Sequence, residues 1–102
     1  MSYVQNIIVI TAYEDTVVQE LDAWLVEEQQ IAPRSALVQV DQYAGGIKAF
    51  EADVWVGACN YLKIDAFVKF VKRLKVKSCY PESFQVFLRD EDEDKFVDVE
   101  QR

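Results

Sequence analysis

The segment Asn6-Ile7-Ile8-Val9-Ile10-Thr11-Ala12-Tyr13 and the stretch that follows it decide the fold of this chain. The segment is short, rich in β-branched residues and closed by Glu14-Asp15, which is typical of a central strand buried on both faces. Apolar residues then recur at a spacing of three and four, at Val17, Val18, Leu21, Trp24 and Leu25. This spacing predicts an amphipathic helix that Asp15 or Thr16 caps and that ends before Pro33.

The next part of the chain predicts a β-hairpin. Residues 36–43 and 48–61 each alternate between apolar and polar side chains, and Gly45-Gly46 lies between the two stretches. Val38 and Val40 share a face with Val54 only if the loop contains an odd number of residues. We therefore expect a three-residue loop at 45–47, or a β-bulge.

The last third of the chain predicts a helix and one or two strands. Apolar residues at helical spacing mark a second amphipathic helix from Ile64 to Leu74, and Pro81 follows its end. Residues 84–89 alternate again, with Phe84, Val86 and Leu88 expected to face inward. Residues 90–102 are expected to form an acidic turn and a short C-terminal strand or tail.

The order β-α-β-β-α-β matches the ferredoxin-like split βαβ arrangement, with sheet order 4-1-3-2. We therefore predict one α+β domain over residues 1–102, with two helices on one face of a four-stranded antiparallel sheet. This fold hosts many unrelated activities, so it does not by itself indicate a function.

Composition argues against several kinds of partner. The 102 residues carry 18 acidic and 11 basic side chains, for a net charge of -7. Such a surface repels polyanions, because nucleic-acid affinity comes largely from lysine and arginine contacts to phosphates. The exception is the basic face of the second helix, formed by Lys69, Lys72, Arg73, Lys75 and Lys77. Without an aromatic platform this face is more typical of a solvated helix, and we disfavour nucleic acid as a partner.

The chain offers no recognisable catalytic or metal-binding set. It contains no histidine, which removes the usual general base and the commonest transition-metal ligand. Asp90, Asp92 and Asp94 have the spacing of the first three EF-hand ligands, but Lys95 and Gln101 occupy positions that require glycine and glutamate. We read this run as a solvated acidic turn.

The remaining candidate motifs have structural interpretations. Gly45-Gly46 joins two strands and opens no helix, so it is no phosphate-binding loop. Cys59 and Cys79 lack a neighbouring histidine and a Cys-x-x-Cys pattern, and we read both as free, unreactive thiols. We expect no catalytic residue, no cofactor and no metal.

The N-terminal residues carry no export or membrane signal that we recognise. The first apolar run, residues 7–10, is too short for a signal peptide or a membrane span. A cytoplasmic protein that makes no membrane contact is therefore expected.

The sheet face that carries no helix is the most informative predicted feature. If even-numbered residues meet the helices, the opposite face presents large aromatics among carboxylates, at Asp41, Tyr43, Glu51, Asp53, Trp55, Tyr61 and Phe87. Cys59 and the odd-numbered residues of the first strand share that face. Aromatic anchors beside steering carboxylates suit a protein partner with a basic rim. We therefore expect these seven residues to bind a protein, as in a regulator, an immunity-type protein or an inhibitor.

Other occupants of this face stay open. A homodimer could cover it, or the chain's own segment 94–102. A further alternative is a dimeric ferredoxin-like enzyme or small-ligand-binding protein, with a pocket on the sheet face lined by Tyr13, Trp55, Tyr61 and Phe87. All of these expectations depend on the even-numbered strand residues lying under the helices.

Overall fold

The computed structural model describes residues 3–40, 45–48 and 50–102. Its elements, in chain order, are β1 (Val4–Thr11), α1 (Asp15–Gln29), β2 (Val38–Gln39), β3 (Asp53–Asn60), α2 (Ile64–Lys77), β4 (Gln85–Arg89) and β5 (Val97–Asp98). Two 3₁₀ turns, at Pro81–Ser83 and Val99–Gln101, follow α2 and β5. The strands form one antiparallel sheet in the order β2-β3-β1-β4-β5. The predicted ferredoxin-like order 4-1-3-2 of the main strands is therefore confirmed, and β5 adds an edge strand.

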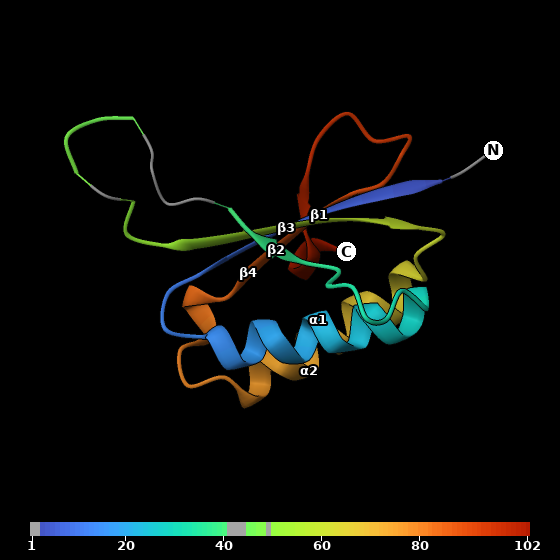
Figure 1. Ribbon diagram of the computed structural model, residues 1–102, viewed down its shortest axis with the longest axis horizontal. Coiled ribbons are helices and arrows are strands. Elements are labelled where there is room, and N and C mark those ends of the chain that lie inside the picture. Colours follow the sequence, from blue (N-terminus) through green and yellow to red (C-terminus); the bar gives the residue numbers. More distant parts are fainter. Residues whose placement is uncertain (1–2, 41–44, 49) are drawn as a thin grey trace.

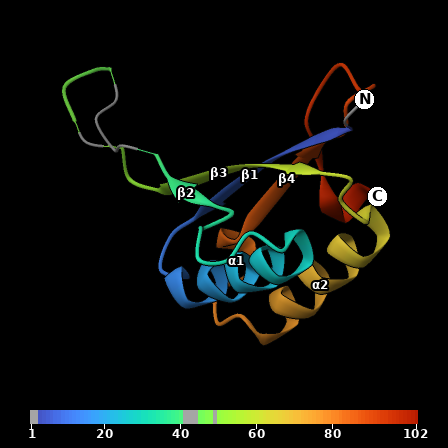
Figure 2. The same cartoon turned by 45° about the vertical axis from the view of Figure 1, so that its right-hand side comes forward.

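Both helices lie against the same face of the sheet, and the turned view shows the same two layers (Figures 1 and 2). The core fills the space between the layers with fully buried side chains, among them Ile7, Val9, Leu21, Leu25, Phe67 and Phe84. In the described part of the chain, no helix lies on the other face (Figure 1).

The start of α1 differs from the prediction. Its N-cap is Glu14 rather than Asp15 or Thr16, and the Glu14 side chain makes no capping hydrogen bond. The Glu14 carboxylate is buried and instead accepts a hydrogen bond of 2.8 Å from the backbone N–H of Tyr80. A contact with a residue beyond α2 therefore replaces the local cap that the sequence pattern favoured.

The strands of the hairpin are shorter than predicted. Val38 lies opposite Val56, and the backbone N–H of Val40 donates to the carbonyl of Val54 at 2.7 Å, so the predicted shared face is confirmed. The three-residue loop is wrong, because Lys48 and residues 50–52 lie outside β3 and the described Gly45–Lys48 are exposed bends. The predicted strand residues 41–43 and 49 lie outside the described residues.

The predicted faces of β1 and β3 are wrong. Val86 and Leu88 of β4 are buried beneath the helices, as expected. The antiparallel register places Val9 opposite Val86, and opposite residues share a face. Val9 also lies opposite Trp55 of β3. The odd-numbered residues of both β1 and β3 therefore face the helices, and the even-numbered residues face away.

Gly57 lies where the chain passes close to this helix-facing side. A Cβ atom at Gly57 would stand 2.3 Å from the backbone oxygen of Ala36 in the segment that leads into β2. Asp22 of α1 holds that segment in place, because its Oδ1 accepts hydrogen bonds of 2.7 Å from the backbone N–H groups of Ala36 and Leu37. The helix-facing side of β3 is thus closed by backbone at its centre.

Candidate functional site

A row of apolar side chains crosses the open face of the sheet. Val38 lies opposite Val56, Val56 opposite Ile8, and Ile8 opposite Phe87. Val38 and Val56 are 61% and 39% exposed. A second row runs beside the first through Val40, Val54 and Ile10. We call the whole set the apolar face: Ile8, Ile10, Val38, Val40, Val54, Val56, Ala58 and Phe87.

Polar side chains surround the apolar face. Asn6 lies opposite both Ala58 and Arg89, while Gln85 lies opposite Ile10. Asp98 of the edge strand lies opposite Phe87. An apolar centre within a polar rim is the anatomy of a protein–protein interface.

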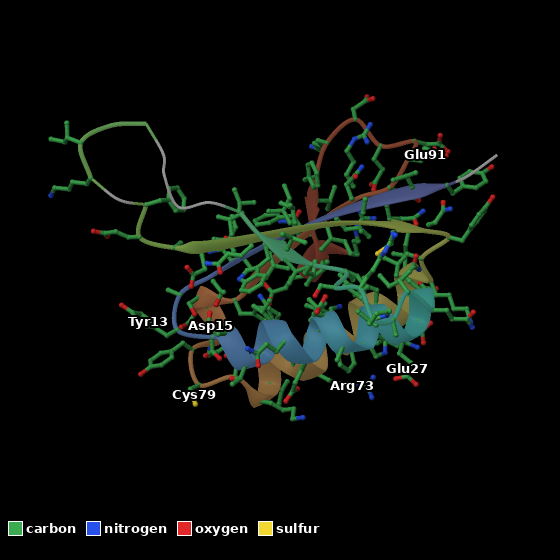
Figure 3. The ribbon with its side chains drawn as sticks, viewed as in Figure 1. Tyr13, Asp15, Glu27, Arg73, Cys79 and Glu91 are labelled. Carbon is green, nitrogen blue, oxygen red and sulfur yellow. The ribbon has the colours of Figure 1, made fainter. Side chains whose placement is uncertain are left out.

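The segment after β4 leaves the apolar face open. Val99 is fully buried, and Glu100 forms an ion pair of 2.9 Å with Lys75 of α2, so residues 99–102 pack on the helix side. Of the segment 94–102, which was one possible cover for the open face, residues 99–102 therefore do not cover it. The acidic loop after β4 rises on the open side, and Figure 3 places Glu91 across the sheet from Glu27 and Arg73 of the helices.

The residues expected to bind a partner do not lie together on one surface. Asp53 and Trp55 face the helices, not the solvent side; Gln39 donates to the Asp53 carboxylate at 3.1 Å, and Trp55 packs against the core. Glu51 is exposed before β3, and Tyr61 is exposed after it. Of the five described residues in this set, only Phe87 lies within the apolar face; Asp41 and Tyr43 lie outside the described residues.

The four residues of the alternative pocket do not converge. Tyr13 is 86% exposed beyond one end of β1, whereas Tyr61 contacts Tyr3 at the other end, with ring centroids 5.8 Å apart. Trp55 and Phe87 lie on opposite faces of the sheet. The pocket on the sheet face that these four residues were expected to line does not form.

Cys59 also lies on the helix side, and its predicted position on the open face is wrong. It is buried, and burial raises the pKa of its thiol to about 11. Cys79 is exposed beyond the end of α2. Both thiols are free, as expected.

The basic face of α2 is partly neutralised. Lys75 pairs with Glu100, and Lys77 lies 3.9 Å from Glu20. The Arg73 guanidinium lies over the Phe70 ring, 5.4 Å from its centroid. These contacts weaken the case for a continuous phosphate-binding surface.

The acidic loop is held to the sheet by hydrogen bonds. Gln5 donates to the Asp90 carboxylate at 3.0 Å, and Arg102 donates to Glu93 at 2.5 Å.

Among the described residues, no cluster of His, Cys, Asp or Glu side chains has the geometry of a metal site.

Comparison with protein-family models, with curated proteins and with solved structures finds no match to this chain. Neither of its helices, within the residues described, has the length and apolar character needed to cross a membrane. Evidence on function therefore comes from the geometry of the chain itself.

Sequence reasoning missed the apolar face, although one signal was present. Glycine in a strand interior often marks the close approach of another backbone. Gly57 is odd-numbered, and another segment of backbone packs against it. This close approach would have predicted that the odd-numbered face of β3 is the covered one. The even-numbered valines Val54 and Val56 would then have been placed in solvent.

Proposed function

We propose that this chain is a small acidic protein-interaction module that binds through its apolar face, and that the occupant is a second copy of the chain. The observation that carries the proposal is the unbroken apolar row from Val38 to Phe87. Antiparallel sheets that face water normally present polar residues there. Large contiguous apolar patches on a protein surface mark interaction sites.

The chemistry of the face favours a permanent partner. Valine, isoleucine and alanine predominate, whereas the hot spots of separable complexes are enriched in Trp, Tyr and Arg. Homodimer interfaces are more apolar than other interfaces. A two-fold axis would set the same patch against itself, so that apolar rows meet apolar rows.

The net charge of -7 does not oppose this arrangement strongly. Arg89 and Asp98, which have opposite signs, are the charged strand residues on the open side. Charges farther away are screened over about 8–10 Å at physiological ionic strength. The strand residues of the open side therefore add little repulsion between two copies, and salt screens the charges of the acidic loop that rises on the same side.

Sedimentation equilibrium with matched variants tests the proposal. The chain has a mass of 11.8 kDa, and we expect about twice that mass at micromolar concentrations. Val56→Asp buries a charge at the centre of the interface and should give the single-chain mass. Val76→Asp is the control, because Val76 lies on α2 and is 87% exposed. Circular dichroism checks that both variants are folded.

Two results would contradict the proposal. The first is a wild-type mass equal to that of one chain at every concentration. The second is equal association of folded Val56→Asp and Val76→Asp.

A further inference from the structure

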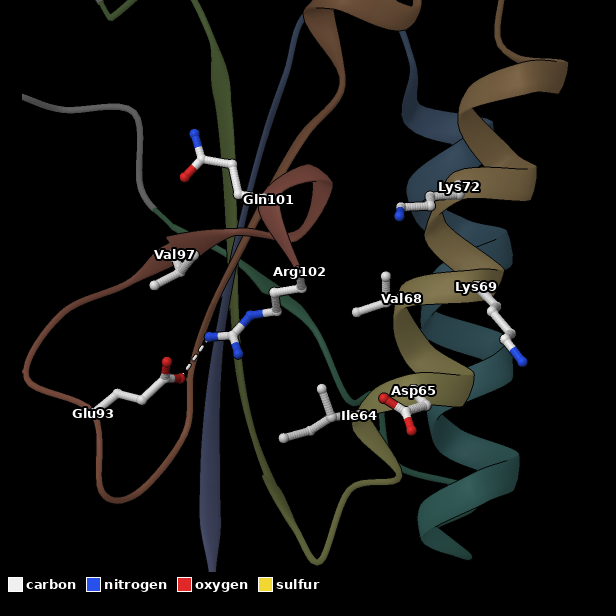
Figure 4. Close-up of a pocket in the computed structure, with 9 residues that line it drawn as sticks. All are labelled: Ile64, Asp65, Val68, Lys69, Lys72, Glu93, Val97, Gln101 and Arg102. Atoms are coloured by element: carbon white, nitrogen blue, oxygen red, sulfur yellow. Dashed lines mark hydrogen bonds and ion pairs between the residues drawn. The ribbon is translucent and has the colours of Figure 1, made fainter.

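A cavity of about 600 Å³ lies apart from the apolar face, between α2 and the segment that follows β4 (Figure 4). Its apolar lining comes from Ile64 and Val68 of α2 and from Val97 of β5. Its cationic lining comes from Lys69, Lys72 and Arg102. Small-molecule sites commonly have volumes of about 300–1,000 Å³ and combine an apolar lining with a few polar groups.

Arg102 supplies a fixed cation on one wall. Its Nη2 donates to the carbonyl of Leu88 at 2.8 Å and to the Glu93 carboxylate at 2.5 Å. Its Nε–H is buried and has no acceptor among the described residues. A buried guanidinium donor without an acceptor is costly.

Lys72 supplies the cation on the opposite wall. Figure 4 shows its ammonium group directed across the cavity toward the segment that carries Gln101 and Arg102. No ion pair of Lys72 occurs within the described chain, whereas Lys75 and Lys77 each lie beside a glutamate. The Lys69 side chain points away from the cavity in the same view.

The charges of the lining select the kind of ligand. The lining residues carry three positive and two negative side chains, which leaves one net positive charge, and the Lys69 ammonium is the one cation that points away from the cavity (Figure 4). The hydrogen bond from Arg102 lowers the pKa of Glu93, so this carboxylate is ionised at neutral pH. A ligand with one negative charge balances the net charge of the lining. A dianion would leave one negative charge unbalanced beside the carboxylates of Asp65 and Glu93.

We propose that this cavity binds a small organic monoanion, a carboxylate on a short apolar chain. The charged groups of Lys72 and Arg102 bind the carboxylate. The apolar chain lies against Ile64, Val68 and Val97. This site is independent of the apolar face and of any association through it.

An NMR titration of the full chain with octanoate tests the site. We expect saturable shifts of the backbone amides of Ile64, Val68 and Val97, and unchanged amides at Ile8 and Val56. Lys72→Gln should weaken octanoate binding about tenfold, because it removes a charge-assisted hydrogen bond. Lys77→Gln, the same change on the same helix but outside the cavity, should bind as the wild type does. The spectra also report whether each variant is folded.

Octylammonium separates recognition of the charge from adsorption of the alkyl chain. It carries the same chain and the opposite charge, so it should not bind the cavity. Failure of octanoate to saturate, equal binding by Lys72→Gln and Lys77→Gln, or equal binding of octylammonium would each overturn the proposal. Shifts confined to Ile8 and Val56 would also overturn it, because they would place the alkyl chain on the apolar face.

Discussion

Arg102 and Glu93 connect parts of the chain that are distant in sequence. Arg102 bonds both the Glu93 carboxylate and the carbonyl of Leu88, so it ties the acidic loop to β4. Gln5 of β1 donates to Asp90 at the start of the same loop. The sequence run 90–94 predicted only a solvated turn, because its partners lie outside it and no local pattern indicates them.

The substitution Glu93→Gln should change how the free energy of unfolding depends on pH. Hydrogen bonds, first from Arg102 and then within the loop at Asp90, lower the folded-state pKa of Glu93 from its ordinary value of 4.5. A lowered folded pKa stabilises the fold above the unfolded pKa, and this contribution is lost as pH falls through the folded pKa. Glu93→Gln should therefore be less stable than the wild type at pH 7, and the difference should shrink below about pH 4.

Urea denaturation along a pH series measures this difference. Asp92→Asn is the control, because Asp92 is an exposed residue of the same loop. Its free energy of unfolding should follow that of the wild type at each pH. A stability difference for Glu93→Gln that stays constant from pH 7 to the acid limit would contradict the account.

At the scale of elements, the sequence predicted some features well because they are local. α2 and β4 follow the predicted ranges closely, since an amphipathic spacing and a proline specify them. The ends of β2 and β3 were predicted poorly, because alternation continues past the residues that have a partner strand. Residues 48 and 50–52 alternate in sequence but lie outside β3.

The faces of β1 and β3 could not be read from either strand alone. Alternation separates the two faces of a strand, but only the register with its neighbours decides which face is covered. Here Ile7 lies opposite both Gly57 of β3 and the buried Leu88 of β4. This register places the odd-numbered residues of β1 and β3 on the covered face. For this reason the predicted binding residues Asp53 and Trp55 lie on the covered side, while Phe87 lies on the open side.

Substitution of Gly57 tests how closely β2 and its leading segment pack on β3. The new methyl group of Gly57→Ala would meet the Ala36 oxygen, which is backbone held by Asp22. We expect a loss of about 1–3 kcal/mol in the free energy of unfolding, as for other overpacked sites. Gly45→Ala is the control, because nothing lies within 4 Å of its added Cβ, and it should leave stability nearly unchanged. Equal stability of the two variants in urea would refute the close contact.

For the whole molecule, the two proposed binding features are spatially separate. The apolar face lies on the sheet surface away from the helices, and the carboxylate cavity lies between α2 and the segment after β4. Most of the acidic side chains behind the net charge of -7 lie outside the apolar face. There they favour solubility.

We propose that the apolar face is exposed in a single chain and buried when two chains associate. Thiol labelling of Val56→Cys in a Cys79→Ser background measures this directly, since Cys59 is buried and has a raised pKa. We predict fast labelling in dilute solution and slower labelling as concentration rises, while Val76→Cys stays fast throughout. Labelling of Val56→Cys at one rate, fast or slow, over the whole concentration range would contradict the account.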